Sequence, residues 1–285
     1  MSNETPVVFG QHQSIGMIHN GKDTSCDTGV VIVVGGPQYR IGSHRQFLKL
    51  SRSLAANNVT SIRFDCSGMG DSGGEFKSYL NIDEDIKSAI DTLQSNCPHI
   101  SKIVLWGLCD AATAIAKYCN KDTRISGVFL LNPWVKDEQL AAEALVKNHY
   151  KKQLLSLHFW KRVISGDVKI FSAVSSFIQN LLNMKSGHSK QQNNTENKAD
   201  STPKSLQQMM QQELQQFSGK AHIILSENDL TAQEFNTAAQ SQQWQKMIKE
   251  KPIPITTIPG ANHTFASEKW RSEIQDLTLG FVGQI

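Results

Sequence analysis

Cys109, Asp229 and His263 are residues of the types used in nucleophilic catalysis, and each follows an apolar run typical of a buried strand. A histidine can withdraw the proton of a thiol, and a carboxylate can fix the histidine tautomer and stabilise its charged form. The thiolate then attacks an acyl carbonyl. We therefore predict a catalytic triad of Cys109, His263 and Asp229, with Glu227 as the nearest alternative acid. Taken singly, each has an ordinary explanation: a buried thiol, a surface histidine and a helix-capping or solvated carboxylate.

The residues around Cys109 fit a nucleophile elbow, the tight turn between a strand and a helix that exposes a nucleophile. The apolar run 103–106 predicts the strand, and the alanine-rich segment 111–117 predicts the helix. The pattern is Gly107-x-Cys109-x-Ala111, with cysteine in place of serine and alanine in place of the second glycine. The positive end of the helix dipole would favour a thiolate at this position.

An oxyanion formed beside Cys109 needs two backbone N–H donors. The first is expected from Asp110, the residue after the nucleophile. The second is expected from the loop that follows the β-branched run 29–34, where Gly36 or Gln38 can donate. Pro37 cannot, because proline has no N–H group. The alternative explanation of this loop is an ordinary strand-terminating turn.

Three further residues are candidates for substrate binding. His44 and Arg45 lie at the start of a helix expected over 43–57, close to the glycine loop, where they can meet a carboxylate or phosphate. Solvated first-turn side chains are the ordinary alternative. Trp134 follows the strand expected over 125–131.

Strand-like runs alternate with amphipathic segments from residue 29 to 131, which predicts a doubly wound, mostly parallel sheet with helices on both faces. The segment 6–19 predicts a leading antiparallel hairpin, and Ser43 is expected to cap the helix over 43–57. Ligands bind at the carboxyl ends of the strands in such sheets. The three candidate triad residues all fall there, in the chain order of an α/β-hydrolase fold.

The periodicity changes between the two groups of strands. We expect residues 1–134 and 219–285 to form the α/β-hydrolase core, and residues 135–218 to form an inserted helical lid. The lid contains a Ser, Gln, Asn and Lys tract at 186–203, which we expect to be mobile because it has too few apolar residues to form a core. A glutamine-rich helix over 206–217 is expected to close the insertion.

Composition gives no support to several classes of function. The net charge of +3 is spread along the chain, so no basic stripe indicates a nucleic-acid partner. Five cysteines without CxxC spacing favour a reducing compartment over a disulfide framework or a metal site. No apolar run approaches membrane-spanning length. We expect a cytoplasmic protein without a metal or cofactor.

Four segments resemble the exosortase A system-associated hydrolases of the α/β-hydrolase superfamily. They are 33–47, 63–72, 106–112 and 131–135. The resemblance implies a bacterial enzyme tied to exopolysaccharide production and exosortase-type protein sorting, with its elbow cysteine at Cys109. The sequence departs from the superfamily consensus at Cys109, at Ala111, and at Ser67, where many members carry arginine.

Three functions remain open from the sequence. The first is an acyl hydrolase (esterase, thioesterase or lactonase) that acts through a thioacyl-enzyme on a small-molecule or carrier-bound acyl substrate. The second is an acyltransferase to a saccharide or carrier acceptor. The third is a catalytically silent hydrolase-fold protein used for binding. Reactivity at Cys109 separates the third from the others, and the need for an acceptor other than water separates the first two.

Overall fold

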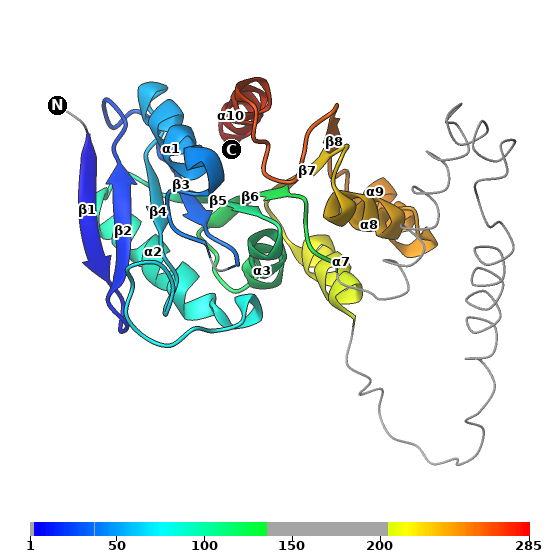
Figure 1. Ribbon diagram of the computed structural model, residues 1–285, viewed down its shortest axis with the longest axis horizontal. Coiled ribbons are helices and arrows are strands. Elements are labelled where there is room, and N and C mark those ends of the chain that lie inside the picture. Colours follow the sequence, from blue (N-terminus) through cyan, green and yellow to red (C-terminus); the bar gives the residue numbers. More distant parts are fainter. Residues whose placement is uncertain (1–2, 37, 136–204) are drawn as a thin grey trace, which may run out of the picture. The chain divides into compact units, whose positions relative to one another are not determined.

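The computed structural model describes residues 3–36, 38–135 and 205–285. Eight strands of this part of the chain form one sheet, in the order β1-β2-β4-β3-β5-β6-β7-β8 (Figure 1). β1 pairs antiparallel with β2, β2 pairs antiparallel with β4, and all other neighbours are parallel. The strands are β1 (Glu4–Phe9), β2 (Ser14–His19), β3 (Thr28–Val33), β4 (Ser61–Phe64), β5 (Lys102–Leu108), β6 (Ile125–Leu131), β7 (Lys220–Ser226) and β8 (Ile255–Ile258).

Helices cover both faces of this sheet. In Figure 1, α1 and α10 lie over one face, and α2, α3 and α7 lie over the other. The helices are α1 (Gln46–Ala56), α2 (Asp83–Asn96), α3 (Asp110–Tyr118), α7 (Leu206–Gln216), α8 (Leu230–Ala239), α9 (Gln242–Glu250) and α10 (Glu268–Val282), with short 3-10 turns η1 (Ser43–Arg45) and η2 (Tyr79–Asn81). Over the described ranges, each helix is too short or too polar to span a bilayer.

The central strands are buried because both of their faces are covered. Every residue of β3 is buried, as its β-branched sequence predicts. Gly29 lets a helix approach this strand closely, since a Cβ atom there would lie 2.9 Å from side-chain atoms of Leu93 and Ile100. Because β3, β5, β7 and β8 all run in the same direction, their carboxyl ends lie at one edge of the sheet. The candidate residues lie at this edge.

The predicted hairpin and the alternation of strands and helices are confirmed, and so is the helix expected over 206–217, which is α7. The prediction that Ser43 caps the following helix is wrong. Ser43 begins the turn η1, and Arg45 in a left-handed conformation is the N-cap of α1, without a side-chain cap. The expected lid lies outside the described residues over 136–204, including the tract 186–203.

Candidate active site

Cys109 lies in the sharp turn between β5 and α3. Its backbone has φ 62° and ψ −123°, a conformation that residues with a side chain rarely adopt. The turn is tight enough to require a small residue, since a Cβ at Gly107 would lie 2.6 Å from the Ile115 side chain and 3.0 Å from the Ala111 carbonyl carbon. Ala111 therefore takes the place of the second glycine without opening the turn, and the half-buried thiol projects from it.

Hydrogen bonds to the end of β6 hold this turn in place. The Cys109 N–H donates to the Leu131 carbonyl at 2.8 Å, and the Trp134 N–H donates to the Cys109 carbonyl at 3.3 Å. The Thr113 hydroxyl donates to the Trp134 carbonyl at 2.7 Å. The Trp134 side chain is half-buried, and its buried indole N–H has no hydrogen-bond partner among the described residues. Trp134 thus supports the elbow through its backbone and keeps one unused donor.

His263 lies beside both other members of the predicted triad. Its Nδ1 lies 2.9 Å from Oδ2 of Asp229, and the Cys109 thiol is near enough to act on its pKa. These two neighbours raise the pKa of His263 to about 10, the Asp229 hydrogen bond contributing most, against the opposing effect of burial. The structure therefore brings Cys109, His263 and Asp229 together at the carboxyl ends of β5, β8 and β7.

Asn132 and Ser226 position the His263 loop, and the sequence reasoning missed both. The buried Asn132 side chain donates to the Ser226 hydroxyl at 2.9 Å and to the His263 carbonyl at 3.0 Å. Its Oδ1 accepts from the Ser226 N–H at 2.8 Å, and the Ser226 hydroxyl donates to the Asn262 carbonyl at 2.9 Å. A polar residue directly after the apolar run 125–131 was the signal in the sequence.

The predicted oxyanion donors of the glycine loop, the N–H groups of Gly36 and Gln38, already donate hydrogen bonds to other acceptors. The Gly36 N–H donates to Oδ2 of Asp110 at 2.7 Å. The Gln38 N–H donates to the Gly36 carbonyl at 2.7 Å, so it points back into its own turn. Gly36 is therefore the better candidate for the second donor. The Gln38 side-chain oxygen is buried without a hydrogen-bond partner in the described residues.

His44 and Arg45 lie in η1, both exposed and both with positive φ. Neither side chain has a hydrogen bond or ion pair to another residue that the structure describes. Their predicted role in substrate binding stays a prediction.

An ion pair joins the loops after β3 and β4. The Arg40 guanidinium pairs with the fully buried Asp65 carboxylate and with Asp71, the latter at 2.8 Å. Asp65 also accepts from the Arg40 and Asp71 N–H groups, at 2.5 and 3.0 Å. A Cβ at Gly70 would lie 2.3 Å from this carboxylate. These contacts fix the loop that carries Gly36 relative to the loop that follows β4.

A pocket of about 260 Å³ lies next to the elbow. It reaches Gly36 and Asp110, and its other lining residues include Cys66, Met69, Phe76, Lys77 and Tyr79. Burial raises the pKa of Tyr79, and the nearby Asp110 and Cys109 raise it further, so its hydroxyl stays protonated beside the elbow. The mixed lining suits an apolar group with a polar end.

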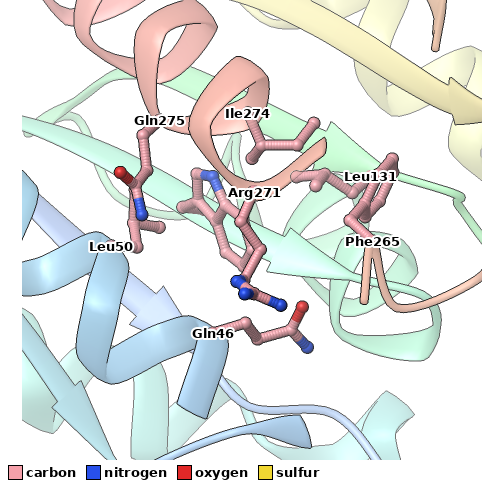
Figure 2. A pocket seen from close by; sticks show the side chains of 8 residues that line it. Gln46, Leu50, Leu131, Phe265, Arg271, Ile274 and Gln275 are labelled. Carbon is pink, nitrogen blue, oxygen red and sulfur yellow. The ribbon is translucent and has the colours of Figure 1, made fainter. Parts of the chain in front are cut away.

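A second cavity lies on the opposite face of the sheet, between α1 and α10. Figure 2 shows Gln46 and Leu50 of α1 facing Arg271 and Gln275 of α10 across it. Its volume is about 20 Å³, which accommodates about one water molecule. It is a packing gap and not a substrate site. Nor do any three His, Cys, Asp or Glu side chains of the described residues group as metal ligands.

No protein-family model and no curated protein sequence matches the chain. Solved structures do match it. The esterase Pf2001 of Pyrococcus furiosus has a TM-score of 0.65 at 14% identity, over 99% of this chain and 91% of that one. Est1E of Butyrivibrio proteoclasticus, solved with ferulic acid bound, has a TM-score of 0.58 at 12% identity, over 97% and 98% of the two chains.

An α/β serine hydrolase homologue of Coxiella burnetii is a third such structure. Its TM-score is 0.54 at 14% identity, and the match covers 97% of this chain and 96% of that one. The likeness extends over nearly the whole length of each protein. Together with the mostly parallel eight-stranded sheet and helices on both of its faces, it shows that this chain has the α/β-hydrolase fold.

Proposed function

We propose that the protein is an acyl hydrolase that uses Cys109 as its nucleophile, His263 as its acid and base, and Asp229 as the carboxylate that orients His263. The observation that carries this proposal is the hydrogen bond of 2.9 Å between His263 and Asp229, with the Cys109 thiol near enough to His263 to raise its pKa. The strained backbone of Cys109 also supports it, since such strain concentrates where a side chain must be presented for reaction.

In the first half of the reaction, His263 takes the thiol proton and Cys109 attacks the acyl carbonyl. The raised pKa of His263, about 10, means that the imidazole holds this proton firmly once it has taken it. The N–H groups of Asp110 and Gly36 stabilise the tetrahedral oxyanion. When the intermediate collapses, the bond from the acyl carbon to the leaving oxygen or sulfur breaks, and His263 returns the proton to that atom.

In the second half, His263 removes a proton from water, and the resulting hydroxide attacks the thioester. The carbon–sulfur bond then breaks, which releases the carboxylic acid, and the proton on His263 restores the thiol. The pocket of about 260 Å³ beside Asp110 is where we place part of the substrate. Est1E with ferulic acid bound is a precedent on this fold for the binding of a small molecule.

The cellular setting is proposed from the sequence. Resemblance to exosortase-associated hydrolases supports a bacterial enzyme linked to exopolysaccharide production. All five cysteines are free, including the partly exposed Cys26 and Cys109, which supports a reducing compartment such as the cytoplasm.

Mass spectrometry of the intact protein tests the proposal. The folded protein is mixed with a panel of p-nitrophenyl esters and acyl thioesters of increasing chain length and quenched in acid within seconds. A mass increase equal to one acyl group, present in the wild type and absent from Cys109→Ala, is expected for at least one ester. His263→Ala should slow its appearance. An adduct that persists in Cys109→Ala would reject the assigned nucleophile.

A further inference from the structure

We propose that the Asp110 carboxylate closes the oxyanion hole of the unliganded protein and must move out before an acyl carbonyl can be activated. This inference rests on the proposed function, because it assigns Asp110 a gating role in the same reaction. Asp110 then contributes in two opposed ways: its backbone N–H is an oxyanion donor, and its side chain competes for the other donor.

The geometry is that of an anion already bound in the hole. Oδ2 of Asp110 accepts from the Gly36 N–H at 2.7 Å, and Oδ1 accepts from the Ala111 N–H at 2.9 Å. One proposed oxyanion donor, the Gly36 N–H, is therefore already bound to a carboxylate and is not free to bind an oxyanion.

The loop is shaped to admit this carboxylate. A Cβ atom at Gly35 would lie 2.0 Å from Oδ1 of Asp110, so a side chain at position 35 would collide with it. The other loop donor offers no substitute, because the Gln38 N–H is directed at the Gly36 carbonyl. An incoming oxyanion must consequently replace the carboxylate at Gly36.

The carboxylate is held by N–H groups without a strong cation. No lysine or arginine of the described ranges forms an ion pair with Asp110. Electrostatic interactions couple its carboxylate to three titratable groups, which are Cys66, Tyr79 and His263. Burial raises the pKa of Asp110, which shows that its charged form is only partly compensated.

The displaced side chain has a place to go. The pocket of about 260 Å³ begins at Asp110 and carries Lys77, Ser78 and Tyr79 on its wall. Rotation of the carboxylate into this pocket would exchange N–H donors for an ammonium group and hydroxyls, and would leave Gly36 free. The hole thus opens only when the gain from binding the oxyanion exceeds the loss of the Asp110 contacts.

The kinetic test uses p-nitrophenyl acetate in single-turnover acylation of four proteins: wild type, Asp110→Ala, Asp110→Asn and Glu268→Ala. Glu268, like Asp110, is the first residue of its helix, but it is exposed, so it controls for the loss of a first-turn carboxylate. Asp110→Ala should acylate roughly tenfold faster, which is below the roughly 10²–10³-fold effect of a single oxyanion donor because the carboxylate only competes for that donor. Asp110→Asn, which keeps an oxygen acceptor, should lie between them, and Glu268→Ala should match wild type. A rate for Asp110→Ala equal to or below that of wild type overturns the proposal.

A second measurement does not depend on activity. In two-dimensional NMR, an amide bound to a carboxylate resonates downfield, so the Gly36 amide should shift upfield in Asp110→Ala and keep its position in Cys109→Ala. If Asp110→Ala does not unfold cooperatively, Asp110→Asn serves instead, and its Gly36 shift should lose the pH dependence seen in wild type. An unchanged Gly36 resonance rejects the closed hole. Absence of acylation in all four proteins rejects the proposed function and leaves this result standing.

Discussion

One oxygen of Asp229 serves two donors: Oδ2 lies 2.9 Å from Nδ1 of His263 and 3.1 Å from the Ala232 N–H. The second bond makes Asp229 the N-cap of α8. The start of α8 therefore fixes the position of the Asp229 carboxylate. This carboxylate cannot rotate away from His263 without losing its N-cap hydrogen bond to the helix. Two separable effects follow, because asparagine is also a good N-cap but carries no charge.

Asp229→Asn should lower the pKa of His263 from about 10 toward its ordinary value of 6.5, since the carboxylate is the main cause of the increase. The helix cap should survive. Titration of the imidazole C–H resonance by NMR measures the pKa directly, and the thermal unfolding midpoint checks the cap. A midpoint of titration that stays near 10 would show that Asp229 is not the residue that stabilises the imidazolium.

The same raised pKa makes stability depend on pH. His263 binds its proton more tightly in the folded protein than in the unfolded chain, so its contribution is complete below about pH 6.5 and is lost as the pH rises to about 10. The difference in unfolding free energy between wild type and His263→Ala should shrink across this window. Urea unfolding at intervals of one pH unit measures it. A difference that grows with pH would reverse the assigned direction.

Iodoacetamide should label Cys109 before the three buried thiols. Burial raises the pKa of Cys119 to about 12, raises that of Cys97, and raises that of Cys66 well above its ordinary value. Cys109 is partly exposed and lies beside His263. Peptide mapping after brief labelling of the folded protein gives the order. Labelling of Cys66 or Cys119 ahead of Cys109 would argue against a reactive thiolate at the elbow.

Arg40→Ala should destabilise the protein by about 3–5 kcal/mol, because it leaves the fully buried Asp65 carboxylate without its cation. Arg52→Ala is a matched control, since Arg52 also pairs with a carboxylate, Glu4, but its side chain is 60% exposed. Its loss should change the unfolding free energy by less than about 1 kcal/mol. Equal effects of the two substitutions in urea unfolding would show that Asp65 does not depend on Arg40.

Asn132→Gly should weaken acylation through His263. Glycine tolerates the positive φ of 42° at this position, so the substitution removes the side-chain bonds to Ser226 and His263 without adding backbone strain. We expect about 1–3 kcal/mol of destabilisation and a lower titration midpoint of His263, because the loop that carries it is released. A purely structural role would lower stability and leave that midpoint unchanged.

The order of strands and helices could be predicted because the central strands β3, β5 and β6 consist mostly of apolar residues and amphipathic segments separate them. The same regularity placed Cys109, Asp229 and His263 at one edge of the sheet, and the structure brings these three side chains together. Their spacing along the chain carries no distance information, but parallel strands align their carboxyl ends.

Contacts between segments remote in sequence could not be predicted in this way. The Asn132 bonds to Ser226 and His263 depend on where the end of β6 lies relative to the His263 loop. Asn132 and His263 are 131 residues apart in the sequence. The sequence pointed to the backbone N–H of Asp110 but not to its carboxylate. The contact of this carboxylate with Gly36 depends on the conformation of the glycine loop. The Ser43 prediction failed because the chain enters α1 through two left-handed residues, His44 and Arg45.

The backbone of Cys109 has a consequence for how this protein would change under selection. Its φ of 62° and ψ of −123° are unfavourable for every residue with a Cβ atom, so the elbow stores strain whether or not the thiol reacts. Glycine at position 109 would relieve that strain. A library screened only for thermal resistance should therefore enrich glycine at position 109. A library screened for activity should instead keep cysteine there, at the expense of folding stability.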